Sequence, residues 1–239
     1  MFRHAFGINV PMQDKAWPRI LPFALFMAII GLEESLIFLD NRGWLDLQGF
    51  AFDLLYPLRP LAALTALLLL YRAYTELQWI DLTKWGQTLL SVCLGLLVFV
   101  LWINMDWTIG AMTEPPGFNP HVFPEGPQRW LMIAIRVSSA VIVVPIMEEI
   151  FWRSFLLRYI INSSFSKVPL GTFTWPSLLI GSLLFGLAHH FILAGIMAGI
   201  AYAWLLYRTK SLAQCILAHA VTNLALAIYV LRTEQWFFW

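Results

Sequence analysis

Charged side chains are scarce in this sequence. Only 12% of the 239 residues are Asp, Glu, Lys or Arg, whereas 60% are hydrophobic and the mean hydropathy is +0.72. A water-soluble domain carries about 25% charged residues, so this chain has too little polar surface for a water-soluble globule. The composition favours an integral membrane protein. The formal net charge of +1 gives no electrostatic basis for binding nucleic acid.

Cysteines and familiar metal motifs are also rare or missing. Cys93 and Cys215 are the two cysteines, both within apolar runs; they form no disulfide framework, and we expect both to be buried. No HExxH motif and no internal repeat occurs.

The long polar segment over residues 1–19 is not typical of a cleavable signal peptide. The chain is expected to form a single integral membrane domain, 1–239.

Long apolar runs predict the fold. A spanning helix needs about 20 mostly apolar residues, and the candidate runs cover residues 20–39, 50–71, 86–105, 130–161, 176–190, 191–207 and 211–231. We therefore expect an all-α fold, a polytopic transmembrane bundle of about seven to eight helices. Arg59 and Pro60 are expected to split the second run, and Pro145 to kink the fourth. Residues 106–129 hold five prolines and are expected to be irregular.

The Lys and Arg residues beside these runs predict the orientation, because cytoplasmic flanks are enriched in them. One side holds Arg3, Lys15, Arg19, Arg72, Lys84, Arg158, Lys167, Arg208 and Lys210; the other holds Arg42, Arg59, Arg129 and Arg232. The richer side includes the N-terminus, so we expect a cytoplasmic N-terminus and an external C-terminus.

Ionisable residues inside membrane helices are costly and mark candidate functional sites. Glu149 and Arg153 are four residues apart on the fourth run, so they share a helix face and are expected to pair. Glu148 points about 100° away and lacks that partner. A carboxylate without a cation in a low-dielectric site is suited to act as a general base.

Two further motifs carry histidines. Phe185 precedes His189 and His190 on the fifth run, and His219 lies four residues before Asn223 on the seventh. At 1.5 Å per residue, Glu148 and His189 both lie about 20 Å from the cytoplasmic ends of their helices. His219 and Asn223 lie roughly 12 and 18 Å from that side. We expect these side chains to share one layer that faces the cytoplasmic half of the membrane.

The three motifs resemble the signature of the CAAX protease and bacteriocin-processing (Abi) membrane family, related to the type II CAAX prenyl endopeptidases: EExxxR, FxxxH, then HxxxN or HxxxD. The resemblance covers the catalytic-core region 130–231. The stretches EEIFWRSFLLRY and YRTKSLAQCILAHAVTNLALAIYVL are similar to the bacterial subfamily that accompanies exosortase sorting systems. Ser154 departs from the wider family, which usually has glycine there; we expect this to affect packing rather than chemistry.

The resemblance implies a glutamate-dependent, metal-independent intramembrane endopeptidase without a cofactor. Glu148 and His189 would activate a water molecule. His219 and Asn223 would stabilise the oxyanion, as hydrogen-bond donors do in acyl transfer. Glu149, Arg153 and Phe185 would support the site. The implied setting is a bacterial inner (plasma) membrane, and the implied partners are a peptide or protein substrate in the lipid bilayer and an exosortase system.

Other interpretations compete with this one. Glu148, His189 and His219 could supply the two-His, one-carboxylate ligand set of a catalytic zinc ion. The polar residues could instead form the core of a non-catalytic immunity or scaffold protein, or the proton relay of a transporter, although no inverted repeat is visible.

Two further groups of residues are expected to have a structural role rather than a catalytic one. Glu33 or Glu34 is expected to pair with Arg136, because they lie at similar depths. The aromatic residues 236–239 are expected to anchor the C-terminus at the membrane interface.

Overall fold

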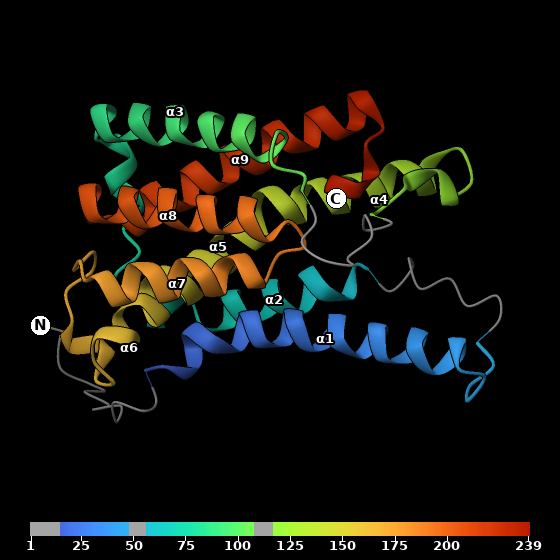
Figure 1. Ribbon diagram of the computed structural model, residues 1–239, viewed down its shortest axis with the longest axis horizontal. Coiled ribbons are helices and arrows are strands. Elements are labelled where there is room, and N and C mark those ends of the chain that lie inside the picture. The colour runs from blue at the N-terminus through green and yellow to red at the C-terminus, as the bar shows by residue number, and fades with distance from the viewer. Residues whose placement is uncertain (1–14, 48–55, 108–116) are drawn as a thin grey trace, which may run out of the picture.

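The computed structural model describes residues 15–47, 56–107 and 117–239. Within these ranges the chain folds into helices joined by short turns, and no β-strand occurs. Most helices run side by side along the long axis of the molecule (Figure 1). The prediction of an all-α fold is therefore confirmed.

Five of the described helices are long and apolar enough to cross a membrane. They are α1 (Trp17–Asn41), α3 (Trp85–Trp102), the continuous helix Pro127–Ile161, α8 (Ile192–Thr209) and α9 (Leu212–Thr233). Two shorter apolar helices, α2 (Leu58–Leu69) and α7 (Trp175–Leu187), bring the described bundle to seven. The chain is thus a multi-pass membrane protein with about the number of helices expected. The short 3-10 turns are η2 (Tyr71–Ala73), η3 (Trp79–Thr83), η4 (Pro120–Val122), η7 (Phe165–Lys167) and η8 (Trp236–Phe238).

The helix Pro127–Ile161 alternates between α-helical and π-helical turns. Its parts are α4 (Pro127–Ser138), η5 (Ser139–Val143), α5 (Val144–Glu149), η6 (Ile150–Leu156) and α6 (Leu157–Ile161), of which η5 and η6 are π-helical. Single π-turns inside α-helices are frequent at functional sites. Here the two π-helical segments flank the short α5 segment, which carries both glutamates.

Pro145 accounts for the first π-turn, because proline has no N–H and clashes with the preceding turn. The Val144 N–H donates to the Ser139 carbonyl, five residues back. By the same five-residue spacing, the Ala140 carbonyl would accept from residue 145. Residue 145 is a proline and has no N–H to donate. The side-chain amide of Asn223 supplies the missing donor, with its Nδ2 2.7 Å from that carbonyl oxygen.

Two helix boundaries differ from those expected. α2 begins only at Leu58, and Arg59 and Pro60 lie in its first turn, where proline is tolerated; they do not split a longer described helix. The earlier part of that predicted helix, with Asp53, falls largely on residues 48–55, outside the described residues. α7 ends at Leu187 rather than at residue 190, so His189 lies in the turn between α7 and α8.

Glycines bring the helices that carry the histidines close to their neighbours. A Cβ atom on Gly95 of α3 would come within 2.4 Å of the Ala218 carbonyl oxygen on α9. A Cβ atom on Gly195 of α8 would come within 3.3 Å of the His189 Cβ atom. Small residues let helix backbones approach closely inside membranes. These two contacts therefore help to fix the positions of His189 and of His219, which follows Ala218.

A buried polar cluster ties the start of α1 to the end of the long helix. Arg19 Nη2 lies 2.6 Å from Glu76 Oε2, and Arg158 Nη2 lies 3.5 Å from Glu76 Oε1. Ser154 donates to Glu76 and accepts hydrogen bonds from Arg19 and Arg158. Burial alone would raise the pKa of Glu76, but hydrogen bonds and the charge of Arg19 hold it below its ordinary value. Ser154 therefore joins a hydrogen-bond network as well as filling space.

Two structural predictions are wrong. Glu33 pairs with Arg59, whereas Arg136 donates a hydrogen bond to the Tyr56 hydroxyl at 3.0 Å. Similar depth was not sufficient to identify the partner, because depth leaves the direction of each side chain around its helix undetermined. Cys93 is exposed on α3 rather than buried, although Cys215 is buried as expected and both are free thiols.

Candidate active site

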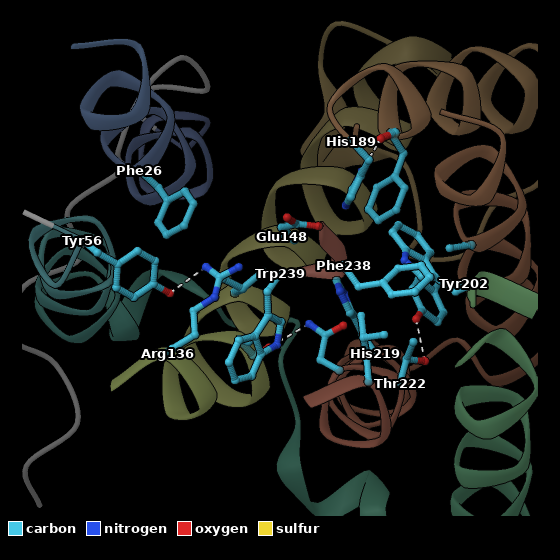
Figure 2. A pocket seen from close by; sticks show the side chains of 17 residues that line it. Phe26, Tyr56, Arg136, Glu148, His189, Tyr202, His219, Thr222, Phe238 and Trp239 are labelled. Carbon is cyan, nitrogen blue, oxygen red and sulfur yellow. Dashed lines mark hydrogen bonds between the residues drawn. The ribbon is translucent and has the colours of Figure 1, made fainter. Parts of the chain in front are cut away.

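Glu148, His189, His219 and Asn223 line one cavity of about 230 Å³. Glu148 comes from α5, His189 from the turn after α7, and the other two from α9. Glu148 lies between His189 on one side and His219 on the other (Figure 2). Helices far apart in the sequence therefore bring the three motifs together around a shared space.

Glu149 lies behind the cavity wall and links two other buried side chains. Its Oε2 atom is 3.1 Å from Arg153 Nε, and its Oε1 atom is 2.9 Å from His219 Nδ1. The Glu149 side chain is 0% exposed and that of Arg153 is 2% exposed. The predicted pair of Glu149 and Arg153 is present. The contact with His219 was not predicted, and it makes Glu149 a link between two of the motifs.

Glu148 has a different environment from its neighbour. It is half-buried, faces the cavity, and its buried Oε2 atom has no hydrogen-bond partner among the described residues. No Lys, Arg or His nitrogen in the described residues lies within 4 Å of its carboxylate oxygens. An acceptor-only group left open in this way is available to bind a water or a substrate N–H.

His189 also presents an open atom to the cavity. Its Nδ1 atom lies 2.7 Å from the carbonyl oxygen of Phe185, which can only accept. Nδ1 therefore carries the hydrogen, and in the neutral ring Nε2 keeps a lone pair. The rings of Phe185 and Trp102 pack against the imidazole at centroid distances of 4.6 and 5.5 Å. These contacts fix the ring although His189 lies in a turn.

His219 and Asn223 offer hydrogen-bond donors from α9. An ionised carboxylate at Glu149 can only accept, so His219 Nδ1 carries a hydrogen. His219 donates through Nε2 as well only when both of its ring nitrogens carry hydrogens. Asn223 uses one Nδ2 hydrogen on the Ala140 carbonyl, and its second Nδ2 hydrogen remains for another acceptor.

Several cavity residues were not identified from the sequence. The Tyr202 ring stacks on His219 at a centroid distance of 5.0 Å, and its hydroxyl donates to Thr222 at 2.8 Å. Phe238 and Trp239 also line the cavity; the expected anchoring of residues 236–239 at the membrane interface stays a prediction. None of these side chains belongs to a polar motif, and no signal in the sequence linked them to the site.

The cavity extends toward one end of the bundle. Its lining includes Arg136 of α4 together with Tyr56 and Trp239. This end is opposite to the start of α1 (Figure 1). At the start of α1, Arg19 and Arg158 both contact Glu76. The expected cytoplasmic N-terminus and the expected site layer in the cytoplasmic half of the membrane both stay predictions.

The ligand chemistry for a metal ion is limited in this site. Within residues 15–47, 56–107 and 117–239, no three His, Cys, Asp or Glu side chains are grouped closely enough to hold a metal ion. Glu148, His189 and His219 share the cavity without forming such a group. His190 is absent from the described lining of the cavity.

Comparison with known protein families matches residues 128–225 to the family described as type II CAAX prenyl endopeptidase Rce1-like. No curated protein and no solved structure matches the chain. The matched region contains all four cavity residues of the three motifs, whereas α1, α2 and α3 lie outside it. The finer resemblance to an exosortase-associated subfamily stays a prediction.

Proposed function

We propose that this chain hydrolyses a peptide bond in a membrane-associated substrate through glutamate-dependent chemistry that uses no metal. Residues 128–225 match the family described as type II CAAX prenyl endopeptidase Rce1-like, whose members are membrane proteases. The observation that carries the proposal is that two groups with an open hydrogen-bonding atom line the same cavity. These are the unpartnered carboxylate oxygen of Glu148 and the Nε2 lone pair of His189.

In the proposed reaction, a water molecule between Glu148 and His189 attacks the scissile carbonyl carbon. Its proton moves to this pair as the new C–O bond forms, and the carbonyl electrons move onto oxygen. The oxyanion accepts a hydrogen bond from the second Nδ2 hydrogen of Asn223, and one from His219 Nε2 when both ring nitrogens of His219 carry hydrogens. When the C–N bond breaks, the stored proton passes to the leaving amine.

Glu149 acts as a positioning residue in this scheme. It contacts neither water nor substrate, but it holds His219 through Nδ1 and is itself held by Arg153. A carboxylate behind an imidazole fixes both the ring orientation and the tautomer. The adjacent glutamates thus have separate tasks, one in the cavity and one behind its wall.

The test begins with membrane peptides that accumulate in a strain lacking the protein. We expect Glu148→Ala and His189→Ala each to lower their processing by about 10²–10⁴-fold, the usual contribution of a general base. His190→Ala is the matched control and should retain activity, because His190 is not among the described residues lining the cavity. Unchanged processing in both test variants would reject the proposal and favour a non-catalytic scaffold.

The zinc-dependent alternative uses Glu148, His189 and His219 as ligands. Metal analysis of the purified protein and cleavage after treatment with a chelator discriminate between this alternative and the metal-free chemistry. Full activity in a metal-free preparation is expected; loss of activity that is restored by zinc would establish the alternative.

We also propose that the N-terminus is cytoplasmic, in a bacterial plasma membrane, and that the Arg136 end of the cavity consequently lies toward the outer side. The excess of Lys and Arg around the start of α1 and its neighbouring turns supports this orientation. Labelling of single cysteines at Lys15 and Arg232 with a membrane-impermeant reagent, in a background without Cys93, tests it. Labelling of intact cells at Lys15→Cys rather than Arg232→Cys would reverse the assignment.

A further inference from the structure

Arg136 places a positive charge in the same cavity as Glu148. It comes from α4, and it is the one Lys or Arg among the described residues that line this cavity. Figure 2 shows Arg136 and Tyr56 on one side of the space, with His189 and Tyr202 on the other and Glu148 between them. The cavity thus has a carboxylate in its proposed catalytic part and a guanidinium on its α4 side.

The surroundings of Arg136 hold the guanidinium in place but leave hydrogen-bond donors unused. Its Cζ atom lies 4.9 Å from the ring centre of Tyr56, 5.8 Å from Phe118 and 5.9 Å from Trp239. Nη1 donates to the Tyr56 hydroxyl, whereas the buried Nε atom has no hydrogen-bond partner. Within the described part of the chain, no carboxylate oxygen lies within 4 Å of this guanidinium.

A carboxylate is the ligand that fits this arrangement. A guanidinium presents five N–H donors in a planar fork that matches the two oxygens of a carboxylate. Aromatic rings stabilise the cation through their faces, but they cannot accept hydrogen bonds from all of its N–H groups. The remaining donors therefore favour an anionic ligand that enters from the cavity.

The position of Arg136 along the helix sets the length of that ligand. Arg136 precedes Glu148 by 12 residues, which corresponds to at most about 18 Å along the helix. An extended peptide covers about 3.3–3.6 Å per residue, so at most about five residues span this distance. We propose that Arg136 binds a carboxylate of the peptide substrate up to about five residues beyond the scissile bond. This inference rests on the proposed protease function.

The carboxylate could be the C-terminal group of the substrate or an acidic side chain, and a peptide series separates these sources. The probes are fluorescein-labelled peptides of leucine and alanine, three to eight residues long. Each is made as a free acid, as a C-terminal amide, and as an amide whose last residue is glutamate. Fluorescence anisotropy measures their binding to Glu148→Gln protein in detergent micelles, in which turnover is blocked.

We expect free-acid peptides of about five residues to bind at least about tenfold more tightly than their amides. Arg136→Gln, added to the same protein, should remove this difference. Arg232→Gln is the matched control, since Arg232 is exposed at the same end of the bundle and is not among the described residues lining the cavity. Equal binding of the glutamate amides and the free acids would show that either source of carboxylate is accepted.

Equal binding of acids and amides to the protein with Arg136 intact would overturn the assignment, as would a difference that survives Arg136→Gln. The first comparison needs no Arg136 variant, so the test holds even if Arg136→Gln does not fold. The test also separates the two proposals. Failure of the wild-type protein to process the membrane peptides that accumulate in the strain lacking it would overturn the protease function. Absence of an acid preference in the protein with Arg136 intact would overturn only the role of Arg136.

Discussion

The adjacent glutamates provide a sharp test, because the same substitution should have opposite consequences at the two positions. Glu149→Gln removes the negative charge between Arg153 and His219. Glu148→Gln removes a carboxylate that has no cationic partner within 4 Å among the described residues. Glutamine preserves the size of the side chain in both variants, so the comparison isolates the charge.

The expected loss of stability in Glu149→Gln follows from the burial of its partner. Arg153 is 2% exposed, so the variant leaves a cation in the bundle without its counter-charge. Breaking a buried ion pair in this way costs about 3–5 kcal/mol. For a chain of about this length, each kcal/mol lowers Tm by about 2–4 °C, which gives a decrease of roughly 6–20 °C.

Glu148→Gln should leave Tm unchanged or raise it, because no ion pair is lost and a buried charge is removed. Its cleavage activity should fall by about 10²–10⁴-fold. Thermal unfolding in detergent micelles and peptide cleavage measure the two effects. A Glu149→Gln protein as stable as wild type, or a Glu148→Gln protein that loses stability, would refute this division of roles.

Three further predictions concern regions around the site. The pKa of Glu76 is held below its ordinary value. Its contribution to stability is therefore complete above about pH 4.3 and is lost as the pH falls through the lower folded-state pKa. Glu76→Gln should lower Tm at pH 7 and flatten the acidic part of a plot of Tm against pH. Gly95→Ala should cost about 1–3 kcal/mol, because its Cβ atom would meet the Ala218 carbonyl at 2.4 Å; an unchanged Tm would exclude this close approach. Tyr202→Phe should cost about 1 kcal/mol through loss of the hydrogen bond to Thr222, and a Thr222→Val background should remove most of that difference.

Much of the bundle could be predicted from the sequence, because a membrane leaves a strong compositional signal. The long apolar runs identify the helices, and the i, i+4 spacing of Glu149 and Arg153 predicts a pair that is present. The estimated depths of Glu148, His189, His219 and Asn223 placed these residues in one layer of the membrane, and all four line the cavity. These signals depend on helix length and helix periodicity, which are both properties of local sequence.

Other features depend on packing and could not be predicted. The stretch Ala188–Phe191 contains no glycine or proline, so nothing marked the turn in which His189 lies. The contact between Glu149 and His219 joins residues 70 positions apart. The partner of Glu33 is Arg59 rather than Arg136, because the direction of a side chain around its helix depends on neighbours that depth alone does not identify.

The π-helical turns of the long helix have a consequence for variation in chain length. Each π-turn contains one residue more than an α-helical turn, because its N–H group donates to the carbonyl five residues back rather than four. Deleting one residue within 139–143 would restore α-helical geometry with little rotation of α4 relative to α5, because the π-turn accommodates its extra residue within one turn. Arg136 and Glu148 would then both stay at the cavity. By contrast, deleting one residue from a stretch that remains α-helical would turn the two side chains apart by about 100°. The segment 139–143 is therefore a part of this helix in which a one-residue difference in length preserves the cavity.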